Sequence, residues 1–145
     1  MPMLISELFR TVTAASPDCV WDALTTTGRP VGYLYGMTVE SDWRPDTAIT
    51  IGLDSQWRLT GEVLNADRPH RLSYTLGDRP GDPSVYVTWE MCRRDNSTII
   101  RLYLDDPYPQ ADAADDLEAT WLPVLSGLVN YLNCGEPPSP QTTGA

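Results

Sequence analysis

The side chains that could perform acid–base or nucleophilic chemistry are few in this sequence and stand apart from one another. The only histidine, His70, lies between Pro69 and Arg71 at the expected start of a strand. A histidine that acts as a general base needs a partner that orients its ring, and no such partner is evident. Ser126 precedes Gly127 inside a helical pattern, unlike the strained turn that exposes a nucleophilic serine. We therefore expect a loop histidine, a helix serine and no catalytic residue.

Residues that could bind a metal ion also lack the spacing of a known site. Cys19, Cys92 and Cys134 are spread over the chain, and with one histidine they do not form a zinc motif. Four acidic residues gather near the expected start of the last helix, namely Asp112, Asp115, Asp116 and Glu118. A helix dipole favours carboxylates there, and the loop spacing of a calcium site is missing. We expect no metal and no cofactor.

The composition limits the partners and the compartment. The formal charge is -10, from 20 acidic and 10 basic residues, and lysine is absent. Nucleic acid and anionic membrane surfaces both require a basic face, so neither is an expected partner. No run reaches the ~18 apolar residues of a membrane span. An odd number of scattered cysteines suits a reducing compartment, with thiols serving as small apolar side chains, so we expect a cytoplasmic protein.

Aromatic side chains are the most informative group for function. The chain has five Trp, seven Tyr and one Phe, so nearly every ring carries a polar group. Such rings suit a pocket that stacks a flat ligand and forms hydrogen bonds to its edge. The expected ligand-binding residues are Trp21, Tyr33, Tyr35, Trp57, Tyr74, Trp89, Trp121, Leu125, Leu128 and Tyr131. The expected mouth of the pocket holds Trp43, Trp57, Tyr33 and Tyr35. Ordinary packing explains the same rings equally well.

One long segment with helical periodicity, residues 112–132, organises the expected fold. Its apolar stripe recurs at steps of three or four residues and comprises Leu117, Trp121, Leu125, Leu128 and Leu132. Pro123 interrupts the pattern, because a proline inside a helix deletes one backbone hydrogen bond and clashes with a carbonyl of the preceding turn. We expect a kink there or a helix that starts again. A short helix is also expected after Ser16, because a hydroxyl cap is followed by Pro17 and Asp18.

Between the two helices the periodicity changes to two, which is typical of half-buried strands. The apolar face expected to point inward comprises Met37, Val39, Ile49, Ile51, Leu59, Val63, Leu72, Tyr74, Leu76, Val87, Trp89, Met91, Ile100, Leu102 and Leu104. A curved antiparallel sheet wrapped on the last helix would bury both apolar surfaces. Residues 4–14 form a first strand near an edge, and Gly61 marks a bulge or a sharp bend. None of the inward residues is acidic, basic or a histidine, which favours binding over acid–base catalysis.

The residue pattern of the last two strands predicts how they pair with each other. If Asp95 and Asn96 form the turn, apolar residues pair across the hairpin as Met91 with Ile100, Trp89 with Leu102, and Val87 with Leu104. A slip of one residue would place apolar side chains on the wrong face, so one register is favoured.

Several segments, taken in order, resemble one known family. They are Pro17 with Val20-Trp21-Asp22-Ala23-Leu24-Thr25, Tyr33-Leu34-Tyr35-Gly36, Val39-Glu40-Ser41-Asp42-Trp43, Gly61-Glu62-Val63-Leu64, Pro69-His70-Arg71-Leu72-Ser73-Tyr74, Val87-Thr88-Trp89-Glu90, and Trp121 with Pro123-Val124-Leu125-Ser126-Gly127-Leu128. This pattern resembles the AHSA-type branch of the SRPBCC superfamily, which shares its fold with START lipid-binding domains. Asp46 departs from the pattern, since glycine is usual at that position.

The resemblance implies an α+β helix-grip fold, in which a curved antiparallel sheet of about seven strands holds a long C-terminal helix. It also implies a cavity between sheet and helix. We expect one domain over residues 1–134, followed by a flexible tail over residues 135–145, whose composition is rich in Pro, Gly, Ser and Thr.

The favoured function is binding of a small hydrophobic, and especially an aromatic, molecule in that cavity. Two alternatives stay open. One is a cyclase or hydrolase of secondary metabolism. The other is an interaction module, either related to chaperone regulation or forming a homodimer through the exposed edge of the sheet.

Overall fold

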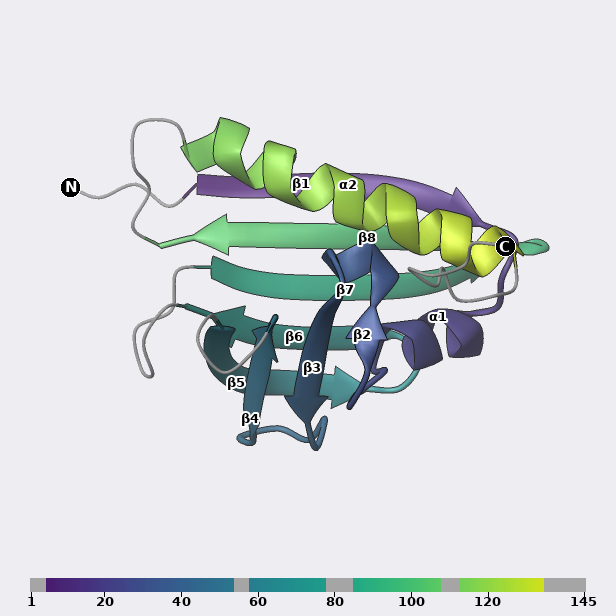
Figure 1. The fold of residues 1–145 in the computed structure, drawn as a ribbon. Helices are drawn as coiled ribbons and strands as arrows, with labels where there is room; N and C mark the ends of the chain where they lie inside the picture. Colours follow the sequence, from purple (N-terminus) through teal and green to yellow (C-terminus); the bar gives the residue numbers. More distant parts are fainter. Residues whose placement is uncertain (1–4, 54–57, 78–84, 108–112, 135–145) are drawn as a thin grey trace, which may run out of the picture.

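The computed structural model describes residues 5–53, 58–77, 85–107 and 113–134 (Figure 1). Its elements in chain order are β1 (Ile5–Thr13), α1 (Pro17–Leu24), β2 (Pro30–Val31), the 3-10 turn η1 (Gly32–Leu34), β3 (Met37–Ser41), β4 (Ala48–Gly52), β5 (Arg58–Asp67), β6 (Arg71–Leu76), β7 (Val85–Arg94), β8 (Ser97–Asp106) and α2 (Ala113–Cys134). The predictions for Trp57 and for the tail over residues 135–145 lie outside the described residues.

The strands form one curled antiparallel sheet that holds the last helix. Their order is β1-β8-β7-β6-β5-β4-β3-β2, and Figure 1 shows β3 and β4 running across the direction of β6, β7 and β8. Helix α2 packs against β1 at one edge and against η1 near the other. The α+β helix-grip fold is therefore confirmed. The sheet has eight strands rather than about seven because the two-residue β2 pairs with β3.

The core lies between the concave face of the sheet and the two helices. Every residue expected on the inward face of the strands belongs to this core, with Met37 and Leu59 at its partly buried margin. The stripe of α2 faces it, and Leu128 is completely buried. Alternation in the strands and the periodicity of the helix therefore predicted both contacting surfaces correctly.

The β7–β8 hairpin has the predicted register. Met91 pairs with Ile100, Trp89 with Leu102, and Val87 with Leu104. Strand β1 pairs with β8 and forms one edge of the sheet, also as expected. These strands place Trp89 on the concave face.

Strand β5 turns the sheet, but the bulge lies elsewhere than predicted. Its first half pairs with β4 and its second half with β6, and the register shifts between Val63 and Asn65. Gly61 lies at the sharp bend, the other predicted alternative, because pairing passes from β4 to β6 just after it and a β-carbon placed there would lie 1.6 Å from the backbone oxygen of Thr75 on β6. Glycine allows this close crossing, and the bulge three residues later bends the strand away.

Helix α2 is continuous through Pro123, so the expected restart of the helix is wrong. Pro123 and Ala119, whose carbonyl loses its helical hydrogen bond, are both exposed. Water can therefore satisfy that carbonyl, and the helix persists. Gly127 lies where α2 meets η1, because a β-carbon there would lie 3.0 Å from Cβ of Tyr33.

Two local predictions concern special backbone positions. The start of α1 is confirmed, since Ser16 caps the helix by accepting a hydrogen bond from the backbone N–H of Cys19 at 3.2 Å. Asp46 has φ of 69°, so it adopts the left-handed conformation that suits the glycine usual in the family.

The two cysteines whose surroundings are described do not pack as apolar side chains in the core. Cys19 and Cys92 are both exposed. Cys19 lies in the first turn of α1, away from its buried side, and Cys92 alternates with the inward residues of β7, so both thiols fall on outer surfaces.

Candidate functional site

The interior of the grip, between the concave face of the sheet and α2, contains a group of three aromatic side chains. The indole nitrogen of Trp89 donates a hydrogen bond to the hydroxyl of Tyr74 at 3.1 Å. The ring of Trp43, from the β3–β4 loop, meets the ring of Tyr74 edge to face, with centroids 6.3 Å apart. The indole nitrogen of Trp43 is buried and has no hydrogen-bond partner among the residues that the structure describes. This nitrogen is a donor that a bound molecule could satisfy.

A second aromatic group joins η1 to both helices. The hydroxyl of Tyr33 donates to the backbone oxygen of Ala23 in α1 at 2.6 Å. The ring of Tyr33 stacks on that of Tyr131 in α2, with centroids 6.5 Å apart. Tyr33 therefore lies in the core and not at a mouth.

Burial keeps the two core phenols protonated. Loss of solvation raises the pKa of Tyr74 to about 12, although the hydrogen bond from Trp89 acts in the opposite direction. Burial also raises the pKa of Tyr33 well above its usual value, with smaller contributions from Tyr74 and Tyr131. Both side chains are neutral at physiological pH, so the interior is apolar and uncharged at these rings.

The other expected ligand-binding residues divide between core and surface. Trp21 in α1 and Trp121, Leu125 and Leu128 in α2 are buried in the core. Tyr35 is 53% exposed, and its hydroxyl donates to the backbone oxygen of Thr120 on α2 at 2.5 Å. It therefore lies on the surface across η1 and α2.

Among the described residues, the buried polar side chains are all hydroxyls, namely Thr13, Ser73, Thr75, Thr88 and Thr98. His70 is exposed in the turn between β5 and β6, and Ser126 is exposed on α2, as expected. Within the same part of the chain, no three His, Cys, Asp or Glu side chains gather as metal ligands would. None of its helices has the length and apolar character needed to cross a membrane.

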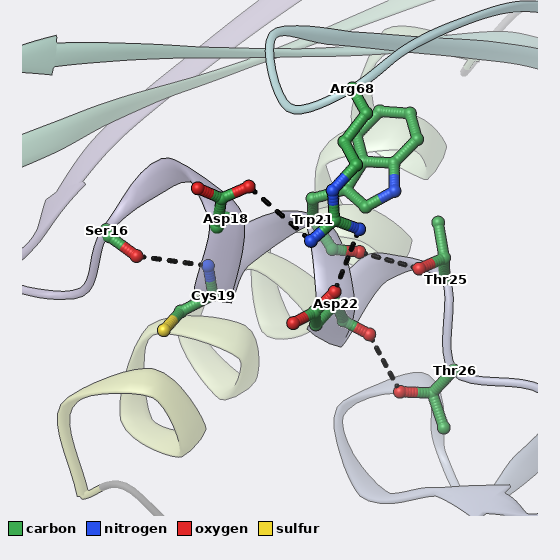
Figure 2. Close-up of polar contacts among 8 residues, drawn as sticks. All are labelled: Ser16, Asp18, Cys19, Trp21, Asp22, Thr25, Thr26 and Arg68. Atoms are coloured by element: carbon green, nitrogen blue, oxygen red, sulfur yellow. Dashed lines mark hydrogen bonds and ion pairs between the residues drawn. The ribbon is translucent and has the colours of Figure 1, made fainter.

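Sequence reasoning missed an ionic cluster on α1 (Figure 2). Arg68, just after β5, reaches Asp22 at 3.0 Å and Asp18 at 3.4 Å. The two carboxylates are four residues apart and share one face of the helix, which is a signal in the sequence. Nothing in the sequence indicated that Arg68 would lie opposite them.

The sequence patterns also did not predict a groove between α1 and the end of α2, which we call the outer groove. This outer groove has a volume of about 350 Å³ and is lined by Ala15, Cys19, Asp22, Ala23, Thr26, Arg29, Tyr131 and Leu132. Because its walls are more than 100 residues apart in the chain, no local pattern could have revealed it.

Solved structures with the same architecture come from several organisms. CalU16 from Micromonospora echinospora has a TM-score of 0.70 and 19% identity, over 88% of this chain and 74% of that one. The Aha1 dimer from Colwellia psychrerythraea has a TM-score of 0.75 and 16% identity, over 90% and 98%. An HSP90 activator from Plasmodium falciparum has a TM-score of 0.71 and 17% identity, over 92% and 98%. These identities establish a shared fold.

No curated protein sequence matches the chain. The family model described as "Activator of Hsp90 ATPase homolog 1-like protein" matches residues 14–133, which include both helices, the curled sheet from β2 to β8 and all the aromatic residues of the interior. The chain therefore belongs to the AHSA1 family.

Proposed function

We propose that the chain binds a small hydrophobic molecule with an aromatic ring system in the interior between the sheet and α2. The observation that carries this proposal is the buried indole nitrogen of Trp43, which has no hydrogen-bond partner and lies beside the Tyr74 and Trp89 rings. An unsatisfied buried donor costs about 1–3 kcal/mol, and a ligand oxygen would remove that cost. The preferred ligand therefore carries a carbonyl or ether oxygen on a flat apolar body.

Binding agrees better with the interior than acid–base catalysis does. The described buried polar side-chain groups are hydroxyls of Ser and Thr, the phenols of Tyr33 and Tyr74, and the indole N–H groups of tryptophan, none of which exchanges a proton near neutral pH. A general acid or base must lie within about 3 Å of the reacting atom and exchange a proton near neutral pH. Tyr74, with a pKa of about 12, remains a neutral donor and suits recognition of an acceptor oxygen.

The test uses two ligands that differ in one group. Fluorene and 9-fluorenone have the same flat three-ring outline, but only the ketone offers an acceptor. Titration followed by tryptophan fluorescence and by native mass spectrometry is expected to show one bound ketone per chain. We expect 9-fluorenone to bind about three- to tenfold more tightly than fluorene, the range of one hydrogen bond.

Trp43→Phe keeps an aromatic ring and removes the N–H, so it is expected to abolish that preference for the ketone. Tyr103→Phe removes one aromatic hydroxyl on β8, at a position that alternates with the inward-facing Leu102 and Leu104, and is the control that is expected to keep the preference. If neither compound binds, or if both bind equally well to the original chain and to Trp43→Phe, the proposal is wrong.

A second candidate, self-association through the edge strand β1, is favoured by two exposed apolar side chains. Leu8 is 52% exposed and Val12 is 46% exposed, on the edge strand of the sheet. Exposed apolar residues on the outer strand of a sheet, whose free edge can pair with another chain, are typical of an interface. The relative from Colwellia psychrerythraea is described as a dimer.

Sedimentation velocity tests this candidate directly. The original chain is expected to sediment as a dimer at micromolar concentration and Val12→Lys as a monomer. Leu64→Lys, at a residue 42% exposed on β5, is the matched control and is expected to remain dimeric. A monomeric original chain would contradict the candidate.

A further inference from the structure

The outer groove has one flat apolar wall. The ring of Tyr131 is held in place because it stacks on Tyr33 at an interplanar angle of 28°. Leu132 lies beside it, partly buried, and Ala23 of α1 is almost completely buried on the opposite side. A fixed aromatic surface of this kind suits a flat ring, since little conformational freedom is lost when the ring stacks there.

The described lining of the groove also carries a positive charge, on Arg29. Arg29 is exposed, and within the described part of the chain no carboxylate lies within ion-pair distance of it. The one carboxylate of the lining, on Asp22, is already paired with Arg68 at 3.0 Å (Figure 2). Arg68 neutralises only one charge of the Asp18–Asp22 pair, so Arg29 is the cation of the described lining that is left to pair with an anion, although the chain as a whole has a formal charge of -10.

We propose that the outer groove is a second binding site, which takes a small aromatic carboxylate of one or two rings. The ring lies against Tyr131 and Leu132, and the carboxylate pairs with the guanidinium of Arg29. Arginine suits this role because its planar group can form two parallel hydrogen bonds to one carboxylate. A volume of about 350 Å³ fits a ligand of this size. This site is distinct from the proposed interior site, because Trp43, Tyr74 and Trp89 are absent from its described lining.

Two exposed thiols allow binding at the groove to be measured separately from binding elsewhere. Cys19 lines the groove, whereas Cys92 lies on the convex face of the sheet. A ligand in the groove shields Cys19 from alkylation by iodoacetamide and leaves Cys92 unaffected. A ligand in the interior shields neither thiol. Peptide mass spectrometry gives the two alkylation rates from the same sample.

The probes are 2-naphthoate and its neutral counterpart 2-naphthamide. Saturating naphthoate is expected to slow alkylation of Cys19 at least threefold without changing the rate at Cys92. The concentration for half-maximal protection is expected to be about three- to tenfold lower for naphthoate than for naphthamide, because only the carboxylate forms a charge-assisted hydrogen bond.

Arg29→Gln is expected to make the two probes equal by weakening naphthoate alone, because the variant keeps a polar side chain and removes the charge. Arg10→Gln, at an exposed arginine on β1, removes the same charge at a distance and is expected to leave both probes unchanged. The proposal is overturned if naphthoate does not protect Cys19, if Cys92 is protected equally, or if Arg29→Gln leaves the preference for naphthoate intact.

Discussion

Inside the grip, Trp89 and Tyr33 direct their polar ends at buried protein atoms, whereas Cys19 and Arg29 in the outer groove are exposed. Tyr131 belongs to both regions, since its ring stacks on Tyr33 and also lines the groove. The two regions can therefore recognise different chemistry with related side chains. The interior offers neutral donors among rings, and the groove offers a charge beside a ring. The difference in burial explains why the interior presents neutral groups and the groove presents a charged one.

The largest difference between the regions is expected in stability, and two leucines on the same helix test it. Leu128 is completely buried, whereas Leu132, one turn later, is only partly buried and lines the groove. Leu128→Ala is expected to lower the free energy of unfolding by about 2–5 kcal/mol, because it removes packed atoms and leaves a cavity. Leu132→Ala is expected to cost about 1 kcal/mol. Urea denaturation that gave equal losses would contradict the distinction between interior and groove.

Alkaline pH probes the neutral state of the interior. The pKa of Tyr74 is about 12 in the folded chain and 10.0 in the reference state, so the unfolded chain loses this proton first. The contribution of Tyr74 to stability is therefore constant below pH 10 and is lost between pH 10 and pH 12, by about 2–3 kcal/mol. Tyr74→Phe is expected to reduce the loss of stability over this range without abolishing it, because burial also raises the pKa of Tyr33. Equal curves for Tyr74→Phe and the original chain would show that the phenol is not buried as described.

Gly127→Ala tests the contact that closes the interior against η1. The added methyl group would lie 3.0 Å from Cβ of Tyr33, so Tyr33 or α2 must shift. We expect a net loss of about 1 kcal/mol, even though alanine is intrinsically about 1 kcal/mol better than glycine in a helix. Ser126→Ala, at the exposed neighbouring position, is the control and is expected to change stability little. A more stable Gly127→Ala would show that η1 is loosely held.

The smallest expected effect on stability belongs to Arg68 beside the groove. Its side chain and those of Asp18 and Asp22 are between 50% and 67% exposed, so the ion pairs contribute about 0.2–1 kcal/mol. Arg68→Ala is therefore expected to leave the unfolding midpoint nearly unchanged. It is expected to weaken naphthoate binding about twofold, because it frees the negative charge of Asp22 in the groove. Unchanged naphthoate binding would show that Asp22 does not influence the ligand.

The interior surfaces were predictable from sequence because each depends on a local period. Alternation in β7 and β8 places Trp89 on the same face as Met91, and the periodicity of α2 brings Leu125 and Leu128 together. Pairing of apolar residues then selects one register for the hairpin. These patterns depend only on residues within one strand, hairpin or helix, so the folded structure shows the surfaces that they predict.

Other features were not predictable because they depend on approach between distant segments. The bulge after Val63 and the crossing at Gly61 depend on how β6 meets β5. The persistence of α2 through Pro123 depends on the exposure of the Ala119 carbonyl. The outer groove depends on where Tyr131 lies relative to α1. Each of these features depends on how segments far apart in the sequence pack together, and the periodicity of residue types within one segment gives no information about that packing.

The crossing at Gly61 also limits which sequences can adopt this architecture. The backbone oxygen of Thr75 occupies the place where any other amino acid would carry its β-carbon. Because this oxygen belongs to the backbone, no side-chain rotation could remove the clash. In a library randomised at position 61, survivors of a folding selection should be glycine alone. The same selection at Thr26 or Arg29 should return many residue types, so one rim of the molecule is free to change its ligand while the strand crossing stays fixed.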